Sequence, residues 1–275
     1  MAITQLTVIG AGLIGGSICL AARQAGFAEH IVAIDRTPDR SRHDIADDWI
    51  EATDQSRVEQ ALDRSTLTVL CTPVRAIIAS LPAVLARGSG AVTDCGSTKV
   101  RVAAAAADLA GGARFVPGHP MAGRPEGGLR HADERLFVGR TWILCPTQSS
   151  PDATELVRQL VNACGATAIE LDPQVHDHSV AYTSHLPQVI ASLLSVLATE
   201  AEATAAAGPG FASATRVAGG AAAMWGDIFE TNGEEIGAAL RQLGARLDGL
   251  ARDLERGDAG PLLATLDRAR QLRGA

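Results

Sequence analysis

Residues 6–17, LTVIGAGLIGGS, join a short apolar strand to a glycine-rich turn and the start of an apolar helix. Three glycines here have the G-x-G-x-x-G spacing, which makes a tight turn, lets a pyrophosphate approach the backbone and lets the helix pack on the strand. The helix that follows presents unpaired N–H groups and the positive end of its dipole to phosphates. The predicted cofactor-binding residues of this turn are Gly10, Gly12, Leu13, Ile14 and Gly15.

A second apolar strand, residues 30–34, leads directly into Asp35. This acid lies about 20 residues beyond the glycine turn, where dinucleotide-binding folds place a carboxylate that binds the ribose. The neighbouring Arg36 can stack on adenine or bind a 2′-phosphate. Because Asp35 would repel such a phosphate, we expect NAD rather than NADP as the cofactor.

Apolar strands and helical segments continue to alternate after this unit. Predicted strands cover residues 66–71, 91–95, 115–116, 141–145 and 167–171, and helices cover 74–87 and 151–164. Between residues 37 and 65 we expect only helical pieces, around Ile45, Trp49, Val58 and Leu62. Alternating strands and helices predict a parallel, doubly wound sheet.

Polar residues that follow these strands should meet at one edge of the sheet, because ligands bind outside the carboxyl ends of parallel strands. The residues predicted at this edge are Asp35, Thr72, Ser97 and His119. Thr72 and the adjacent Pro73 are expected to border the cofactor.

No strand signal remains after residue 171. One long helix is expected over residues 175–203 with a kink at Pro187, followed by helices 213–219, 222–230, 234–256 and 260–272. Apolar residues of helix 234–256 recur every three or four positions, a stripe that belongs either to a core or to a subunit interface. The predicted fold is α/β: a Rossmann-type, doubly wound, mostly parallel sheet in residues 1–171 and an all-α domain in residues 172–275.

Composition excludes several classes of function. A net charge of −7 argues against nucleic-acid binding, which needs a basic surface. The five cysteines lack C-x-x-C spacing, and His176 and His178 do not share a helix face, so we expect no metal site. The chain has neither a basic leader nor an uninterrupted apolar stretch of about 18 residues, so we expect a cytoplasmic protein without a membrane partner.

Four side chains are candidates for chemistry. His119 lies in a Gly/Pro-rich turn, residues 117–123, that can aim it into a cleft, although it can equally be structural. Ser97 either lines the same cleft or caps a helix. His185 precedes a proline on an apolar helix, as a core residue or at a ligand-lining kink. Arg216, in an apolar region, needs an anionic partner from the protein or a substrate.

Lys99 is the chain's single lysine and opens the helix that follows Ser97. It can either reach the cofactor or be solvated.

Five segments together resemble the prephenate/arogenate dehydrogenase family of tyrosine biosynthesis, part of aromatic amino acid biosynthesis. They are GAGLIGGS (10–17), DCGSTK (94–99), GHPMAG (118–123), HDHSVAYTSHLPQ (176–188) and GFASATRVA…MWGDIFETN (210–232). They occur in the order of the family. The first segment is shared with many dehydrogenases, whereas the combination of GHPMAG with the later segments is specific.

The resemblance implies an NAD-dependent oxidoreductase that oxidatively decarboxylates prephenate to 4-hydroxyphenylpyruvate, as a homodimer joined through its helical half. It assigns His119 as the catalytic histidine that takes the proton of the ring hydroxyl. Ser97 would lie near that hydroxyl, Arg216 would pair with a substrate carboxylate, and His185 would line the substrate pocket. An arginine and a base near neutral pKa agree with this chemistry.

The loop after GHPMAG departs from the family pattern and leaves the substrate open. Arg124 favours the pyruvyl carboxylate of prephenate, whereas Glu126 can hold the amino group of arogenate. We therefore expect prephenate, with arogenate or 4-amino-4-deoxyprephenate as alternatives. A non-catalytic NAD-binding regulator is the remaining alternative, against which the set of His119, Ser97 and Arg216 argues.

Overall fold

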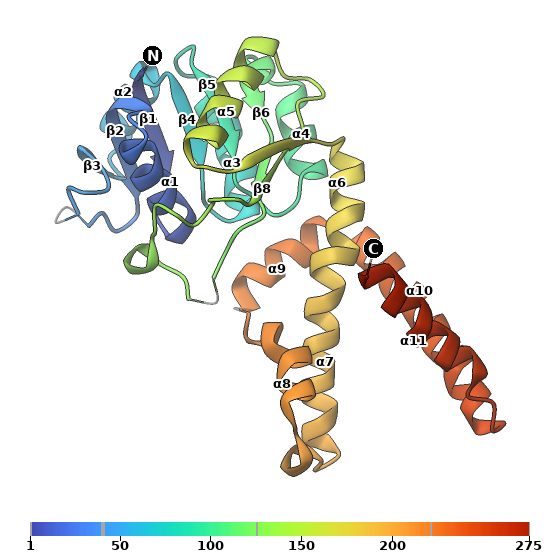
Figure 1. The fold of residues 1–275 in the computed structure, drawn as a ribbon. Coiled ribbons are helices and arrows are strands. Elements are labelled where there is room, and N and C mark those ends of the chain that lie inside the picture. The colour runs from blue at the N-terminus through green and yellow to red at the C-terminus, as the bar shows by residue number, and fades with distance from the viewer. Residues whose placement is uncertain (1, 40–41, 125, 221, 275) are drawn as a thin grey trace.

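The computed structural model describes residues 2–39, 42–124, 126–220 and 222–274. An α/β part comes first in the chain, and a helical part extends from one end of it (Figure 1). The predicted fold class is therefore confirmed.

The main sheet has six strands in the order β3-β2-β1-β4-β5-β6, and all of its pairings are parallel. The strands are β1 (Ile3–Ile9), β2 (Ala28–Asp35), β3 (Asp48–Glu51), β4 (Leu67–Leu70), β5 (Ala91–Asp94) and β6 (Phe115–Val116). The order reverses between β1 and β4, which creates the crevice where open α/β sheets bind ligands. The glycine turn follows β1 and lies at this point.

Strand β3 corrects the prediction of helical pieces alone between residues 37 and 65. Trp49 and Ile50 of β3 are buried and pair with β2, while α2 (Gln55–Arg64) supplies a helix in this region. Strand β3 (DWIE) has only two apolar residues between two acidic ones, too few for an apolar run or an alternating pattern that would reveal a strand in a sequence.

Helices cover both faces of the sheet, because the strand side chains alternate between two apolar layers. Leu67 and Val69 of β4 belong to the layer under α1 (Leu13–Gln24) and α5 (Pro151–Ala163). Leu70, at the end of the same strand, belongs to the layer under α3 (Val74–Leu85) and α4 (Val100–Ala107). The sheet is thus buried on both sides, as parallel sheets are.

A second, three-stranded sheet was not expected. Strand β7 (Gly118–Pro120) pairs antiparallel with β8 (Thr141–Leu144), and β8 pairs parallel with β9 (Thr167–Glu170). The strands predicted at residues 141–145 and 167–171 are present, but they belong to this second sheet and not to the main one. The prediction of an irregular turn at His119 is wrong, because His119 lies on β7 opposite Ile143.

The helical part begins with one continuous helix. It consists of α6 (Pro173–Val180), a π-helical segment (Ala181–His185) and α7 (Leu186–Glu200). The irregularity predicted at Pro187 lies in the turn before it. Proline has no N–H to donate back along the helix, and the wider π turn accommodates that loss.

This continuous helix is the one segment among the described residues that is long and apolar enough on average to cross a membrane, with a mean hydropathy of 1.3. A third of the 18-residue window is buried in the protein. His176 and Asp177 interrupt the apolar sequence and are buried against the α/β part.

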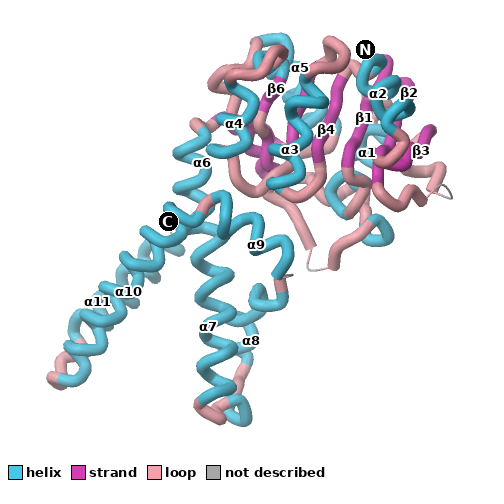
Figure 2. The backbone as a smooth tube through the Cα atoms, turned by 180° about the vertical axis from the view of Figure 1, so that it is seen from behind, coloured by secondary structure: helices cyan, strands magenta, loops and turns pink. Residues whose placement is uncertain are grey.

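The described residues after α7 include the α-helices α8 (Pro209–Thr215), α9 (Ala222–Thr231), α10 (Gly233–Glu255) and α11 (Gly260–Arg273). Helices α10 and α11 form one projecting arm, and α7 with α8 forms another (Figure 2). Of the predicted apolar stripe on α10, Ile236 is buried, but Leu247 and Leu254 are 55% and 49% exposed. The alternative of a simple core therefore holds only for the first turns of α10.

Candidate active site

The glycine turn has the geometry of a phosphate-binding site. Gly10 adopts a φ of +95°, and a Cβ atom there would approach the Cys71 carbonyl carbon to 2.9 Å. A Cβ atom at Gly15 would collide with the carbonyl oxygen of Gly10. Gly12 occupies the N-cap position of α1 and has open space where a side chain would stand. The backbone at this helix end is thus accessible, and the residues present fit the pyrophosphate of a dinucleotide.

We predict that Gly15→Ala weakens NAD binding by at least about tenfold, because the added methyl group must push the turn away from β1. Isothermal titration calorimetry with NAD measures the effect. Gly249→Ala on α10, where a Cβ atom meets nothing within 4 Å, is the matched control and should bind NAD normally. Unchanged affinity in Gly15→Ala would place the cofactor elsewhere.

Asp35 holds the glycine turn from the end of β2. Its Oδ2 accepts a hydrogen bond from the Ala11 backbone N–H at 2.9 Å, and its Oδ1 accepts one from Thr37 at 3.1 Å. A carboxylate has further lone pairs, so this position is compatible with ribose binding. The ribose contact itself stays a prediction.

A cavity of about 1180 Å³ opens beside the turn and is lined by four of the nine predicted cofactor residues and by Ser97. Its walls come from the α/β part and from α9, which contributes Met224, Asp227 and Ile228. The predicted residues that line it are Ile14, Arg36, Thr72, Pro73 and Ser97. Leu13 packs its side chain into the core instead, so only its backbone can meet a cofactor.

Helix α9 is tied to the α/β part beside this cavity. Arg75 Nε donates to Asp227 Oδ1 at 2.7 Å, and Arg75 Nη1 donates to Glu230 Oε2 at 2.8 Å. Thr98 Oγ1 also donates to Thr231 Oγ1 at 2.8 Å. These contacts hold the helical part over the carboxyl ends of the strands.

His119 lies on β7, partly exposed, with its Nδ1 2.8 Å from Nε2 of His176. Desolvation lowers the pKa of His119 well below its usual value, and the nearby Lys99 ammonium lowers it further. The imidazole is therefore neutral at neutral pH, as a proton acceptor must be.

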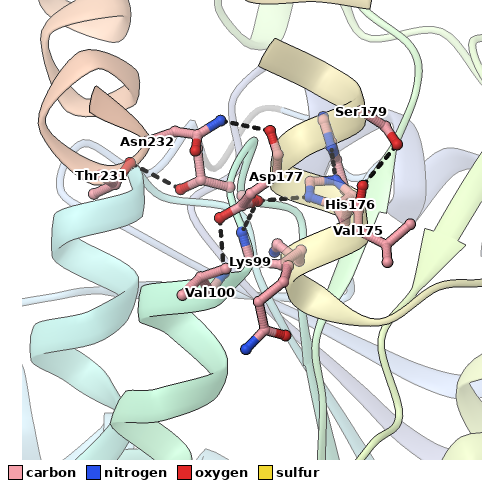
Figure 3. A network of polar contacts seen from close by, with 12 residues as sticks. Lys99, Val100, Val175, His176, Asp177, Ser179, Thr231 and Asn232 are labelled. Atoms are coloured by element: carbon pink, nitrogen blue, oxygen red, sulfur yellow. Dashed lines mark hydrogen bonds and ion pairs between the residues drawn. The ribbon is translucent and has the colours of Figure 1, made fainter. Parts of the chain in front are cut away.

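Asp177 links the two parts of the protein (Figure 3). Its Oδ1 accepts hydrogen bonds from His176 Nδ1 and from the Lys99 backbone N–H, both at 2.7 Å, and its Oδ2 accepts one from Val100 at 2.9 Å. A carboxylate from α6 thus caps α4, which overturns the alternative that Ser97 is the cap of this helix.

Lys99 is fully buried, so both sequence alternatives for it are wrong. Its Nζ forms an ion pair with Asp94 and donates to the Gly118 carbonyl oxygen at 2.6 Å. Asp94 also accepts from the backbone N–H groups of Gly96 and Gly118, at 2.7 and 3.0 Å. The pair therefore joins the end of β5 to β7, the strand that carries His119.

His185 lies at the end of the π-helical segment and is 1% exposed. Its Nδ1 is 3.3 Å from Asn232 Nδ2, and its ring meets the edge of Trp225 with centroids 5.9 Å apart. Burial lowers its pKa to about 4, so it is neutral in the physiological range.

Arg216 and Arg124 lie in a second cavity, of about 530 Å³, which Ser97 does not line. Arg135 and Arg140 line it as well, so four guanidinium groups border one space. Arg124 also forms an ion pair with Asp133. Met121 and Ala122, just after β7, form part of the wall and connect this cavity to the strand that carries His119.

Within the described ranges, no group of three or more histidine, cysteine or acidic residues is arranged to hold a metal ion. The cysteines are all free thiols there, and Cys71 and Cys95 approach to 3.6 Å at the ends of β4 and β5.

His176, Asp177 and Asn232 were not predicted as part of the site. The detectable signal was the run of polar residues HDH at the start of an otherwise apolar helix. The two histidines of this run do not share a helix face, so they were not expected to bind one metal ion together. One of them instead supports His119, while His178 is exposed and bonded to Glu235.

Comparison with known proteins identifies two matching family models. Residues 18–170 match the prephenate dehydrogenase nucleotide-binding domain, and residues 172–268 match the prephenate dehydrogenase dimerization domain. The chain is 29% identical to prephenate dehydrogenase of Bacillus subtilis over 278 residues, covering 98% of this chain and 75% of that protein.

Two solved structures are similar over nearly the whole chain. Prephenate dehydrogenase from Aquifex aeolicus, in complex with hydroxyphenyl propionate and NAD+, has a TM-score of 0.89 at 26% identity, covering 99% of this chain and 98% of that one. Arogenate dehydrogenase from Synechocystis has a TM-score of 0.82 at 26% identity, covering 98% and 99%. With both of its halves matched in order, the chain belongs to the prephenate dehydrogenase family.

Proposed function

We propose that the chain is an NAD-dependent dehydrogenase that oxidatively decarboxylates prephenate to 4-hydroxyphenylpyruvate and carbon dioxide in tyrosine biosynthesis. The observation that carries the proposal is His119, a neutral imidazole on β7, the strand that leads directly into Met121 and Ala122 in the wall of the arginine-lined cavity. Formation of NADH on addition of prephenate tests it. The Aquifex aeolicus relative, solved with NAD+ and a hydroxyphenyl compound, supports both ligands.

When bound, NAD supplies the hydride acceptor for oxidation of the ring carbinol. His119 accepts the proton of the ring hydroxyl as the carbonyl forms, and its lowered pKa keeps it ready to do so. Ser97, at the wall of the cofactor cavity, is placed to orient the same hydroxyl. When the ring carboxylate leaves as carbon dioxide, its bonding electrons aromatise the ring, and the protonated His119 can return its proton to the phenolate oxygen.

The arginine-lined cavity favours prephenate over arogenate. Prephenate carries two carboxylates and no amine, which suits the guanidinium groups of Arg124, Arg135, Arg140 and Arg216. Arogenate carries an additional ammonium group, which the same cavity would repel unless Glu126 compensates. Arogenate dehydrogenase of Synechocystis has the same fold, so the choice rests on these charges.

We predict that Arg216→Ala raises the KM for prephenate by about 10- to 100-fold and changes kcat less. Loss of one charge-assisted hydrogen bond to an anion costs about 1.5–3 kcal/mol. Steady-state kinetics at saturating NAD measures both constants. Arg252→Ala, on the exposed face of α10, is the control and should behave like wild type. An unchanged KM would mean that Arg216 is structural.

We also propose that the enzyme is a homodimer joined through its helical half. The second family model is a dimerization domain. Exposed leucine side chains on three helices support this assignment: Leu193 and Leu197 on α7, Leu247 and Leu254 on α10, and Leu263 and Leu266 on α11. A monomer in water would gain by covering so many apolar side chains.

Two further assignments are proposals. We divide the chain into domains at residues 171 and 172, a division supported by the start of α6 at Pro173 and by the two family models. We place the enzyme in the cytoplasm, where NAD and its proposed substrate are available.

A further inference from the structure

Three side chains from two different parts of the protein form a continuous hydrogen-bonded chain that ends at the proposed base. His119 Nδ1 lies 2.8 Å from His176 Nε2, and His176 Nδ1 lies 2.7 Å from Asp177 Oδ1. His176 and Asp177 are almost fully buried, at 0% and 1% exposure, so water does not compete for these bonds. His119 comes from β7, and the other two residues come from α6.

The hydrogen bonds determine where the protons lie. Both carboxylate oxygens of Asp177 accept hydrogen bonds from backbone N–H groups, those of Lys99 and Val100 (Figure 3). Asp177 is therefore also the acceptor toward His176, and the proton between them belongs to His176 Nδ1. When neither ring is charged, His176 has a lone pair on Nε2 and His119 Nδ1 donates to it, which leaves the Nε2 of His119 unprotonated and available.

We infer that His176 and Asp177 are positioning residues, which hold His119 in the tautomer whose Nε2 can accept the substrate proton. This inference rests on the proposed function, in which His119 removes the proton of the ring hydroxyl. Because the bonded partners also fix the plane of the His119 ring, they set its direction toward substrate as well as its proton.

The same chain accommodates the proton that His119 receives. Once Nε2 is protonated, His119 carries protons on both nitrogens, and the Nδ1 proton lies on the hydrogen bond to His176. Its transfer to His176 Nε2 places the positive charge beside the Asp177 carboxylate. The reverse transfer restores the proton to His119 for return to the product oxygen, so no proton is gained or lost by the protein.

Other titratable groups near His119 do not take the place of Asp177 in balancing a positive charge on the histidines. Lys99 faces His119 from the end of β5, but its ammonium group is paired with Asp94. His185 faces it from the π-helical segment and is neutral, because burial lowers its pKa to about 4. The Cys145 thiol after β8 is also neutral, since burial raises its pKa to about 12. Asp177 is therefore the acid that balances charge on the two histidines.

Asp177 also makes the tautomer of His119 depend on the contact between the α/β part and the helical part. Its carboxylate caps α4 of the α/β part, and its own carbonyl oxygen accepts a hydrogen bond from Asn232 Nδ2 at 2.8 Å. The helical part therefore supplies the hydrogen-bond partner of His119 only when it is packed against the nucleotide-binding part.

The test is His176→Leu in the full-length enzyme, with His178→Leu as the matched control on the same helix. Leucine accepts no hydrogen bond, so His119 Nδ1 loses the partner that fixes its tautomer and ring plane. We expect kcat to fall about 10²-fold, while the KM for prephenate and the affinity for NAD stay within about threefold. His178 is exposed and bonded to Glu235, and its variant should keep full kcat. A wild-type kcat in folded His176→Leu would overturn the inference.

Nitrogen NMR of ¹⁵N-histidine-labelled wild-type enzyme gives a second readout that needs neither a variant nor turnover. We expect both His119 and His176 to be protonated on Nδ1 and unprotonated on Nε2. A proton on Nε2 of His119 in the resting enzyme would overturn the inference even if prephenate is the substrate. If the predicted tautomers are found but prephenate is not oxidised, the proposed function fails and the positioning role of the pair stands.

Discussion

His119→Asn is expected to lower kcat by about 10²-fold or more while NAD binds with unchanged affinity. Asparagine is similar in size and polarity to histidine, but it cannot take up a proton. The residue lies on β7, outside the glycine turn that would hold the cofactor, so the loss should be confined to the chemical step. Stopped-flow or steady-state formation of NADH measures kcat, and calorimetry measures NAD affinity.

The pH dependence follows from the direction of the pKa shift. Burial lowers the pKa of His119 well below 6.5, so its neutral form is fully present at neutral pH and is lost only as the pH falls through that lowered value. Wild-type kcat/KM should therefore be flat around neutrality and decline only under acidic conditions. His119→Asn should lack this acidic decline.

His30→Asn, an exposed histidine on β2, is the control for both measurements and should match wild type. If His119→Asn retains wild-type turnover, His119 is not the base. In that case the chain of hydrogen bonds that ends at it serves only the fold.

Lys99→Met is expected to destabilise the protein by about 3–5 kcal/mol, because it leaves the Asp94 carboxylate buried without its cation. The substituted side chain is of similar length, so packing changes little. The Gly118 carbonyl also loses its donor. Urea unfolding followed by circular dichroism measures the free energy of unfolding.

Arg158→Met provides the matched control for this variant. Arg158 pairs with Glu170 on the surface, where both side chains are at least a third exposed, and such pairs contribute about 0–1 kcal/mol. If the two substitutions lower the free energy of unfolding by the same amount, the buried Lys99–Asp94 pair contributes no more to stability than the surface pair does.

The main sheet was predictable because its signals are local. The glycine spacing, the strand before it and the acid after the next strand all lie within one stretch of sequence, and each follows from backbone geometry. Strands β3 and β7 were missed because their own residues carry little strand signal. Strand β3 has only two apolar residues between two acidic ones, and the strand character of β7 comes from pairing with β8 rather than from its own glycine and proline.

The site was predicted in part. Ser97 and the cofactor residues follow strand ends of the main sheet, so its topology brings them to one edge, whereas His119 lies on β7 of the second sheet. The partner of His119 comes from a helix 57 positions away, and no local pattern shows that β7 and α6 meet. Lys99 was misjudged because a lone lysine at a helix start is normally solvated, and its burial depends on Asp94 and Gly118.

The most direct test of the proposed function is NADH formation by the purified enzyme with prephenate, arogenate and 4-amino-4-deoxyprephenate in parallel, each with NAD and with NADP. We predict fastest turnover for prephenate with NAD, accompanied by release of carbon dioxide and formation of 4-hydroxyphenylpyruvate. Faster turnover of an amino-bearing substrate would be consistent with the proposed mechanism but would contradict the assignment of prephenate as the substrate. No turnover of any of the three by enzyme that binds NAD would contradict the assignment as a dehydrogenase.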